Sequence, residues 1–194
     1  EIGHDGVISL LKEDVENAVA AIEGVMETTF GDNKNPLLLS VRSGARVSMP
    51  GMMDTVLNLG LNDESVLGVV KRTNNERFAW DSYRRFVQMY GSVVLGMKPE
   101  TKEDEDPFEE IIDRLKGKRH IALDTEFTVQ DLQDLVYDFK DAVKKSTGHD
   151  FPSDPWEQLW GAVIAVFNSW NGKRAVVYRK INGYPSDWGT AVNV

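Results

Sequence analysis

The sequence predicts a helix-rich α+β fold. Apolar side chains recur at three- and four-residue spacing through several long segments, which is the period of an amphipathic helix. One short apolar run, residues 37–41, instead has the length of a strand and leads into a loop rich in glycine and methionine. With 194 residues, of which 41% are hydrophobic and 27% charged, the chain can bury a core of ordinary composition.

The first element is predicted to be a helix over residues 7–30, ended by the polar stretch 31–33. Its apolar side chains form one stripe, made of Leu11, Val15, Val19, Ile22 and Met26. The strand 37–41 follows, and because it is apolar on both faces we expect it in the interior of a sheet. A loop over 42–53 and a short element over 54–59 complete this part of the chain.

Residues 62–147 have a different character, since predicted helices there are joined by polar loops. Four helix starts are indicated by capping residues or proline: Asn62, Asn75, Pro107 and the Thr128/Asp131 capping box. Residues 96–106 form an acidic, proline-containing stretch that we expect to be an exposed loop. Gly148 is predicted to end the last helix. We interpret this block as a helical insertion into a β-containing parent unit.

The C-terminal part begins with a strong helix start. Asp154, Pro155 and Glu157 combine an N-cap, a proline in the first turn and a carboxylate at the third helical position. The helix carries a face that is most simply core, made of Trp156, Leu159, Trp160, Val163, Phe167 and Trp170. A short amphipathic segment over 174–181 comes next, and residues 190–194 are predicted to begin a strand.

These boundaries predict two units. Residues 1–61 together with 148–194 form one discontinuous unit, and residues 62–147 form the inserted helical subdomain. The sequence begins at Glu1 without a methionine and stops where a strand is starting. We therefore expect the chain to be a piece of a longer protein.

Composition and charge exclude several classes of function. A net charge of −9 argues against a broad nucleic-acid footprint or a polybasic membrane patch. Without cysteine the chain has no disulfide, thiolate metal site or cysteine nucleophile, and no apolar run reaches the roughly 18 residues of a transmembrane helix. The three histidines show no metal-ligand spacing, so no metal site is predicted. Asp124 and Glu126 could ligate a hard cation, but a solvated turn is the simpler interpretation.

Arg42 is the strongest candidate for chemistry, because it follows the apolar strand and enters a loop that contains Gly44 and Gly51. A guanidinium binds phosphate oxygens in pairs, and consecutive backbone N–H groups of a glycine loop can bind an anion. Structural alternatives stay open: an arginine that ties the loop to a carboxylate, and glycines that serve turn geometry alone. Three methionines of this loop either cover a ligand or fill the core: Met49, Met52 and Met53.

Four blocks of sequence carry a resemblance to a known family. They are NPLLLSVRSGARVSMPGMMDTVLNLGLND, ERFAWDSYRRFVQMYGSVVLGM, FPSDPWEQLWGAVIAVFNSW and DWGTAVNV. In these blocks the chain resembles the N-terminal nucleotide-binding domain of the pyruvate phosphate dikinases, and the likeness covers nearly the whole chain. The resemblance implies an ATP-grasp fold, in which two α/β lobes hold ATP. This chain would be one lobe with the helical insertion.

The resemblance also implies roles for individual residues. Arg42 would be the arginine that binds the ATP phosphates, and the one catalytic residue of this lobe. The loop implied to close over the phosphates contains Gly51, Met52 and Met53, with Asp54 and Thr55 beside it. The family's ATP lysine, its acidic metal ligands and a glutamine would lie outside the chain. ATP and Mg²⁺ are therefore expected as cofactors of the intact enzyme, with no metal ligands in this piece.

For the complete enzyme, the resemblance implies interconversion of ATP, phosphate and pyruvate with AMP, pyrophosphate and phosphoenolpyruvate through a phosphohistidine on another domain. The second lobe and the histidine domain are expected partners, neither a nucleic acid nor a membrane is expected, and the intact enzyme is expected to be a homodimer. The expected compartment is the cytoplasm, with plastid and glycosome also open. The isolated chain is predicted to fold but not to turn over. Two alternatives stay open: a phosphoenolpyruvate synthase-like lobe, and a non-catalytic interaction module.

Overall fold

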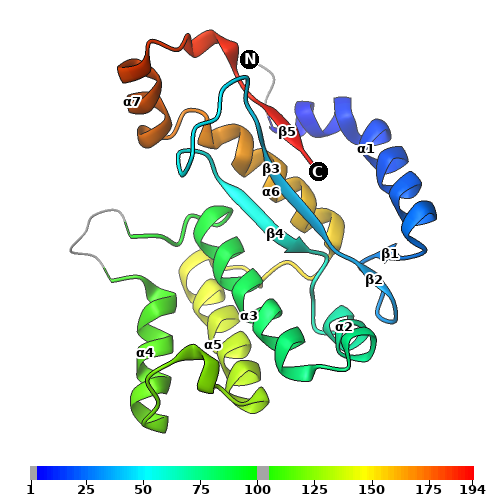
Figure 1. Ribbon diagram of the computed structural model, residues 1–194, viewed down its shortest axis with the longest axis vertical. Helices are drawn as coiled ribbons and strands as arrows, with labels where there is room; N and C mark the ends of the chain where they lie inside the picture. Colours follow the sequence, from blue (N-terminus) through cyan, green and yellow to red (C-terminus); the bar gives the residue numbers. More distant parts are fainter. Residues whose placement is uncertain (1–3, 100–104) are drawn as a thin grey trace.

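The computed structural model describes residues 4–99 and 105–194 and confirms a helix-rich α+β fold with small sheets (Figure 1). The helices are α1 (His4–Met26), α2 (Ser65–Thr73), α3 (Glu76–Val93), α4 (Pro107–Arg119), α5 (Val129–Thr147), α6 (Pro155–Ser169) and α7 (Lys173–Asn182), with 3-10 turns η1 (Asp124–Glu126) and η2 (Ser186–Trp188). The strands are β1 (Thr29–Phe30), β2 (Pro36–Leu37), β3 (Leu39–Gly44), β4 (Thr55–Leu59) and β5 (Ala191–Asn193). Part of the predicted polar loop, 100–104, lies outside the described residues. In the described ranges, none of the helices combines the length and apolar character that crossing a membrane requires.

The main sheet has three antiparallel strands in the order β4-β3-β5, so β3 is its central strand. Buried and exposed side chains alternate along β3: Leu39 and Val41 are buried, whereas Ser40 and Arg42 are exposed. The prediction of a strand that is apolar on both faces was therefore wrong. An antiparallel sheet can leave one face uncovered. Here α6 lies behind the sheet and covers only the face that carries Val41 (Figure 1).

The N-terminal helix is shorter than predicted. It ends at Met26, and Glu27 adopts a left-handed φ of 52°, which turns the chain toward β1. Phe30, expected in the helix, lies in β1 instead, and its N–H donates to the carboxylate of Glu23 at 2.7 Å. The predicted stripe is only partly buried, since Val19 is buried but Met26 is 58% exposed. Helix α1 lies at the side of the molecule (Figure 1), and Val15 and Ile22 of the stripe pack against the core while remaining partly exposed.

Helices α2 to α5 form a block beside the sheet, and their starts follow the predicted caps. The Asn75 side chain accepts a hydrogen bond from a backbone N–H in the first turn of α3, at 3.0 Å. Thr128 and Asp131 form the predicted capping box at the start of α5. The Asn62 side chain accepts the N–H of the first residue of α2 at 2.8 Å. These local hydrogen bonds satisfy N–H groups that a helix leaves unpaired at its start.

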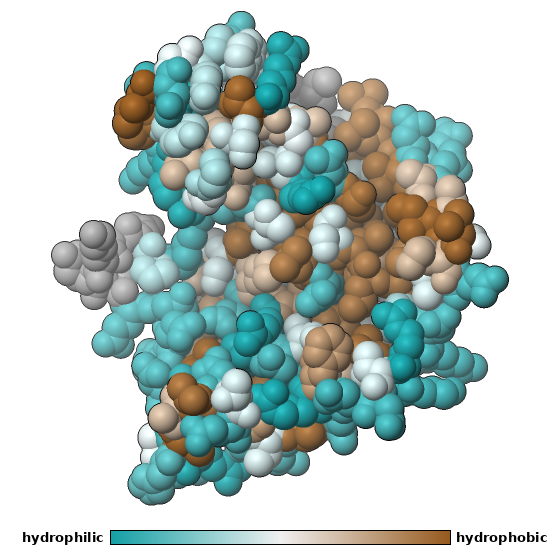
Figure 2. Space-filling view, viewed as in Figure 1, coloured by the Kyte–Doolittle hydropathy of each residue, from teal (hydrophilic) through white to brown (hydrophobic). Residues whose placement is uncertain are grey.

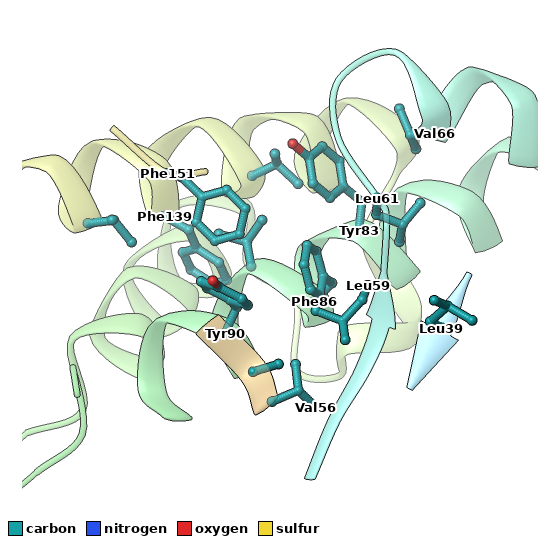
Figure 3. Close-up of a cluster of buried hydrophobic side chains, with 14 of the residues drawn as sticks. Leu39, Val56, Leu59, Leu61, Val66, Tyr83, Phe86, Tyr90, Phe139 and Phe151 are labelled. Atoms are coloured by element: carbon teal, nitrogen blue, oxygen red, sulfur yellow. The ribbon is translucent and has the colours of Figure 1, made fainter. Parts of the chain in front are cut away.

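One apolar core joins the helical block to the sheet (Figure 3). Phe86 and Tyr90 of α3 pack edge-on against Phe151, with ring centroids 5.7 and 5.3 Å apart. The same cluster contains Val56 and Leu59 of β4. Because this core is shared, the helical block fixes the position of β4, and with it the end of the loop that precedes β4.

The chain leaves the sheet through a β-bulge and a glycine corner. The register between β3 and β4 shifts near Asn58, whose φ is 61°. Gln158 of α6 is fully buried, accepts the N–H of Gly60 at 2.9 Å and donates to the carbonyl of Leu61 at 3.0 Å. The Gln158 side chain thus pairs the N–H of Gly60 and the carbonyl of Leu61, and it ties the end of β4 to α6.

The η1 turn is structural. Asp124 forms ion pairs with Lys116 at 2.7 Å and Arg84 at 3.3 Å. Burial by itself would raise the pKa of Asp124, but the hydrogen bond from Lys116 and the charge of Arg84 hold that pKa below its ordinary value. The Glu126 carboxylate accepts the N–H of Leu123 at 2.7 Å. Both carboxylates that could have ligated a cation are therefore engaged, Asp124 by basic side chains of α3 and α4 and Glu126 by backbone at the turn.

Candidate functional site

Arg42 lies in β3, the central strand of the main sheet (Figure 1). Its side chain is exposed whereas that of Val41 is buried, so Arg42 lies on the open face. The prediction placed Arg42 in a loop after the strand, and this was wrong, because pairing with β5 continues β3 to Gly44. In the register Arg42 stands opposite Thr55 of β4 and Asn193 of β5. Its side chain is exposed and, within residues 4–99 and 105–194, makes no hydrogen bond or ion pair. The guanidinium is therefore available to an anion that approaches the open face.

The sheet brings several predicted site residues together. Directly opposed residues of antiparallel strands point to the same face, so Arg42 and Thr55 are neighbours there. Asp54 immediately precedes Thr55, and its backbone N–H donates to the Oγ of Ser169 at 3.2 Å. The loop over 45–54 thus ends beside Arg42, at a point fixed by α6.

That loop contains a tight turn over residues 49–52. The N–H of Met52 donates to the carbonyl of Met49 at 3.1 Å, with Pro50 and Gly51 at the two central positions. Gly51 has a φ of 70°, as the third position of a type II turn requires. A Cβ added to Gly51 would meet no atom within 4 Å, so the position needs glycine for its conformation and not for space. Gly51 therefore serves the geometry of the turn, and its role toward an anion stays a prediction.

Gly44 serves a different purpose. It lies in β3 without a left-handed φ, so it does not serve turn geometry. A Cβ at Gly44 would lie 3.0 Å from the Nδ2 of Asn193 and 3.3 Å from the Cβ of Ala191. Gly44 therefore makes room for β5 and does not shape an anion loop.

The three methionines of the loop differ in burial. Met49 is only 7% exposed and fills the interior, so it does not cover a ligand. Met52 and Met53 are half-buried next to the exposed Gly51. The Sδ of Met53 lies 3.8 Å from the Oγ of Ser169. Only the two methionines that follow Gly51 are placed to reach a ligand at the loop.

Basic residues gather beside the loop. Met52 and Asp54 line a cavity of about 770 Å³ together with Lys98, Lys173 and Arg174. This local positive charge contrasts with the net charge of −9 and would attract an anion toward the loop. Arg42 lines none of the best-formed cavities in the part of the chain that the structure describes. The candidate phosphate arginine lies on an open surface and not in a closed cleft.

The open face is largely apolar around the arginine. Leu57 of β4 is 42% exposed, and apolar surface continues across the sheet toward α1 (Figure 2). There Leu10, Val25 and Met26 are 67%, 84% and 58% exposed. Large exposed apolar areas commonly mark contact surfaces. A cover over this face would exclude water from Arg42 and strengthen its attraction to an anion.

The part of the chain that the structure describes shows no cluster of metal-ligating side chains. Across residues 4–99 and 105–194, no three His, Cys, Asp or Glu side chains gather closely enough to hold one. Asp54 is the one predicted site residue with a carboxylate, and by itself it offers no cluster of protein ligands that would mark a metal site. No chemical step is therefore assigned to a metal through these residues.

Sequence reasoning missed three residues near the site. Asn193 flanks Arg42, Ser169 accepts the Asp54 N–H, and the ring of Trp188 lies 5.7 Å from the guanidinium of Arg46. Each lies far along the chain from its partner, by 115 residues in the case of Ser169. No local spacing pattern signals contacts of this kind.

A helix-rich α+β domain with an exposed strand arginine beside a Pro-Gly loop fits the class of nucleotide-binding domains. Comparison with known families agrees with this class. Residues 8–194 match the family described as "Pyruvate phosphate dikinase, AMP/ATP-binding domain". The chain belongs to this family.

Curated relatives carry the corresponding name. The chain is 50% identical over 185 residues to the pyruvate, phosphate dikinase of Clostridium symbiosum. It is 50% identical over 184 residues to those of Rhizobium meliloti and Giardia intestinalis. Each match covers 95% of this chain and 20% of the relative, so the chain spans about a fifth of the length of these relatives. The matches confirm the resemblance that the four sequence blocks indicated.

Proposed function

We propose that the chain is the nucleotide-binding part of a pyruvate phosphate dikinase. The complete protein would interconvert ATP, phosphate and pyruvate with AMP, pyrophosphate and phosphoenolpyruvate, through a phosphohistidine on another domain. The observation that carries the proposal is the register pair of Arg42 and Thr55, which places an exposed guanidinium beside the end of the Pro-Gly loop. The AMP/ATP-binding description of the matching family supports ATP as the ligand.

Arg42 would bind the phosphate oxygens of ATP. A guanidinium can donate two parallel hydrogen bonds to one phosphate, and each charge-assisted bond contributes about 1.5–3 kcal/mol. Phosphoryl transfer depends mainly on positioning and on stabilising negative charge, so a fixed cation here would assist both binding and catalysis. The central strand holds the Arg42 backbone in a packed sheet, while the exposed side chain can adjust to the ligand.

The Pro-Gly turn would close over the phosphates. Within the described ranges, the backbone N–H groups of Gly51 and Met53 donate no hydrogen bond, so both can donate to phosphate oxygens. The flexible thioethers of Met52 and Met53 could follow the ligand surface. Thr55 lies on the same face as Arg42, which directs the loop and the guanidinium toward one ligand.

The same proposal includes the domain organisation. Residues 1–61 with 148–194 would form one ATP-grasp lobe, and residues 62–147 the helical insertion. The exposed apolar surface on the open face of the sheet supports a second lobe, elsewhere in the polypeptide, that covers ATP from the other side. ATP should bind only weakly to the isolated chain, because one lobe buries only part of the ligand.

Further proposals concern the rest of the polypeptide. The ligands for Mg²⁺, the carrier histidine and the contact of a homodimer would all lie in segments other than this chain. We place the protein in the cytoplasm, although relatives from Mesembryanthemum crystallinum and Flaveria trinervia are named chloroplastic.

A labelling experiment with the full-length protein tests the reaction. In the proposed reaction ATP becomes AMP and gives up two phosphoryl groups. One group goes to pyruvate, so the other must join inorganic phosphate to form pyrophosphate. Radiolabelled inorganic phosphate should therefore appear in pyrophosphate when ATP and pyruvate are present.

Two outcomes would reject this assignment. A phosphoenolpyruvate synthase-like enzyme would form phosphoenolpyruvate without placing label in pyrophosphate. A non-catalytic interaction module would form neither product at any phosphate concentration.

A further inference from the structure

The hydroxyl of Ser169 links the end of the loop to helix α6. Ser169 is 8% exposed, and its Oγ donates to the carbonyl of Val166 at 2.7 Å and accepts the N–H of Asp54 at 3.2 Å. The same oxygen lies 3.8 Å from the Sδ of Met53. Ser169 therefore touches both residues through which the loop passes into β4.

The other stem of the loop is held in a different way. The guanidinium of Arg46 lies 5.7 Å from the ring centroid of Trp188, and the Met49 side chain is buried. Between these contacts and Ser169, the turn at Gly51 is exposed, and a Cβ added there would meet no atom within 4 Å. The loop thus has two held stems and an exposed tip at Gly51.

We propose that Ser169 is a positioning residue that sets where the loop rests before it closes on the phosphates of ATP. The effect on ATP rests on the proposed function, whereas the contact with Asp54 exists without any ligand. Helix α6 is a rigid support, because Asp154 caps its start and it packs against the sheet. Ser169 also lines the basic cavity beside the loop, but only 8% of its surface is exposed and its hydroxyl is already engaged by Val166 and Asp54. Its role is therefore to hold Asp54 and not to bind the phosphates.

Hydrogen exchange and ATP kinetics of the full-length Ser169→Ala protein test this role. Loss of the Asp54 hydrogen bond should raise amide exchange across residues 49–55 about fivefold. The KM for ATP should rise about two- to fivefold, because a smaller fraction of molecules would hold the loop in its binding position. The kcat should stay unchanged, because Ser169 does not touch the reacting groups.

Ser65 provides a matched control. Its buried Oγ donates to the carbonyl of Gly60 at 2.7 Å and accepts the N–H of Asn62 at 2.9 Å. Ser65→Ala therefore removes the same two kinds of hydrogen bond at a different corner of the chain. It should lower thermal stability as Ser169→Ala does, but leave exchange across 49–55 and the KM for ATP unchanged.

A second variant keeps the test decisive if the alanine protein does not fold. Ser169→Cys has similar volume, but its sulfur is a weak acceptor, so it should show the same faster exchange. Unchanged exchange across 49–55 in the Ser169 variants, or an equal rise in Ser65→Ala, would overturn the proposal. If exchange rises only in the Ser169 variants while the wild-type protein binds no ATP, the loop anchor stands and the proposed function fails.

Discussion

Substitution of Gly51 by alanine isolates the backbone requirement of the loop. Gly51 has a φ of 70° in an exposed turn, and a Cβ there would meet no atom within 4 Å. Gly51→Ala therefore causes no collision and only disfavours the left-handed backbone, by about 1–2 kcal/mol. As a ratio of conformers, this is roughly a five- to thirtyfold loss of the observed turn.

Gly148 offers a matched control with the same strain. It has a φ of 78° and open space at the Cβ position, but it ends α5 in the helical block. Both substitutions should lower the free energy of unfolding by at most about 1–2 kcal/mol. Only Gly51→Ala should also raise the KM for ATP, by up to roughly five- to thirtyfold, because the binding conformation of the loop becomes less populated.

Steady-state kinetics of the full-length proteins, with ATP as the varied substrate, measure the effect on the site. Urea unfolding of the same proteins measures the effect on stability. Equal KM values for Gly51→Ala and Gly148→Ala would refute the reasoning, since the same backbone strain would then have no consequence specific to the loop.

Two further predictions concern the frame around the loop. Gln158→Ala should lower the free energy of unfolding by about 3 kcal/mol, because it leaves buried backbone groups at the Gly60 corner unpaired, and an unchanged urea midpoint would contradict this. Burial by itself would raise the pKa of Asp131, but the hydrogen bonds of Thr128 and the charge of Arg119 hold it below the ordinary 3.8. The ionised Asp131 carboxylate therefore stabilises the fold at pH values above the ordinary pKa of 3.8. This stabilisation is lost as the pH falls through the lower pKa of the folded state. Asp131→Asn should destabilise by about 0.5–2 kcal/mol at neutral pH. The difference from wild type should shrink in acid, and a constant difference across a pH series of unfolding curves would exclude the effect.

Features set by neighbouring residues could be predicted from the sequence. The caps at Asn75, Thr128 and Asp154 each accept an N–H from the same helical turn. The turn around Gly51 closes on itself in the same way. Such contacts depend on residue types at fixed short spacing, so the sequence shows them directly.

Features set by distant pairing could not be predicted. The run that contains Leu37 and Leu39 looked like one interior strand, but β2 ends at the first residue and β3 begins at the second. The extension of β3 to Gly44 depends on β5, at the other end of the chain. Hydrophobicity also does not tell which side chains find a partner, since Met49 is buried while Met26 is 58% exposed.

The candidate site likewise combines features that the sequence indicates with features that need the fold. Residue type and order singled out Arg42 and Gly51 as candidates, and the description of the matching family agrees with nucleotide binding. The register that places Arg42 beside Thr55, and the anchoring of Asp54 by Ser169, needed the fold. Both depend on how the sheet and α6 pack, which no local pattern encodes.

The central claim is that Arg42 binds the phosphates of ATP, and calorimetric titration of the full-length protein with ATP measures this directly. Arg114 supplies the control: it is exposed on α4 and, in the part of the chain that the structure describes, forms no ion pair. Arg42→Ala should weaken ATP binding by at least about 1.5–3 kcal/mol, the contribution of one charge-assisted hydrogen bond, which is roughly tenfold to a hundredfold in Kd. Arg114→Ala removes the same charge elsewhere and should leave the Kd near that of the wild type. Equal affinities of the two variants for ATP would contradict the account.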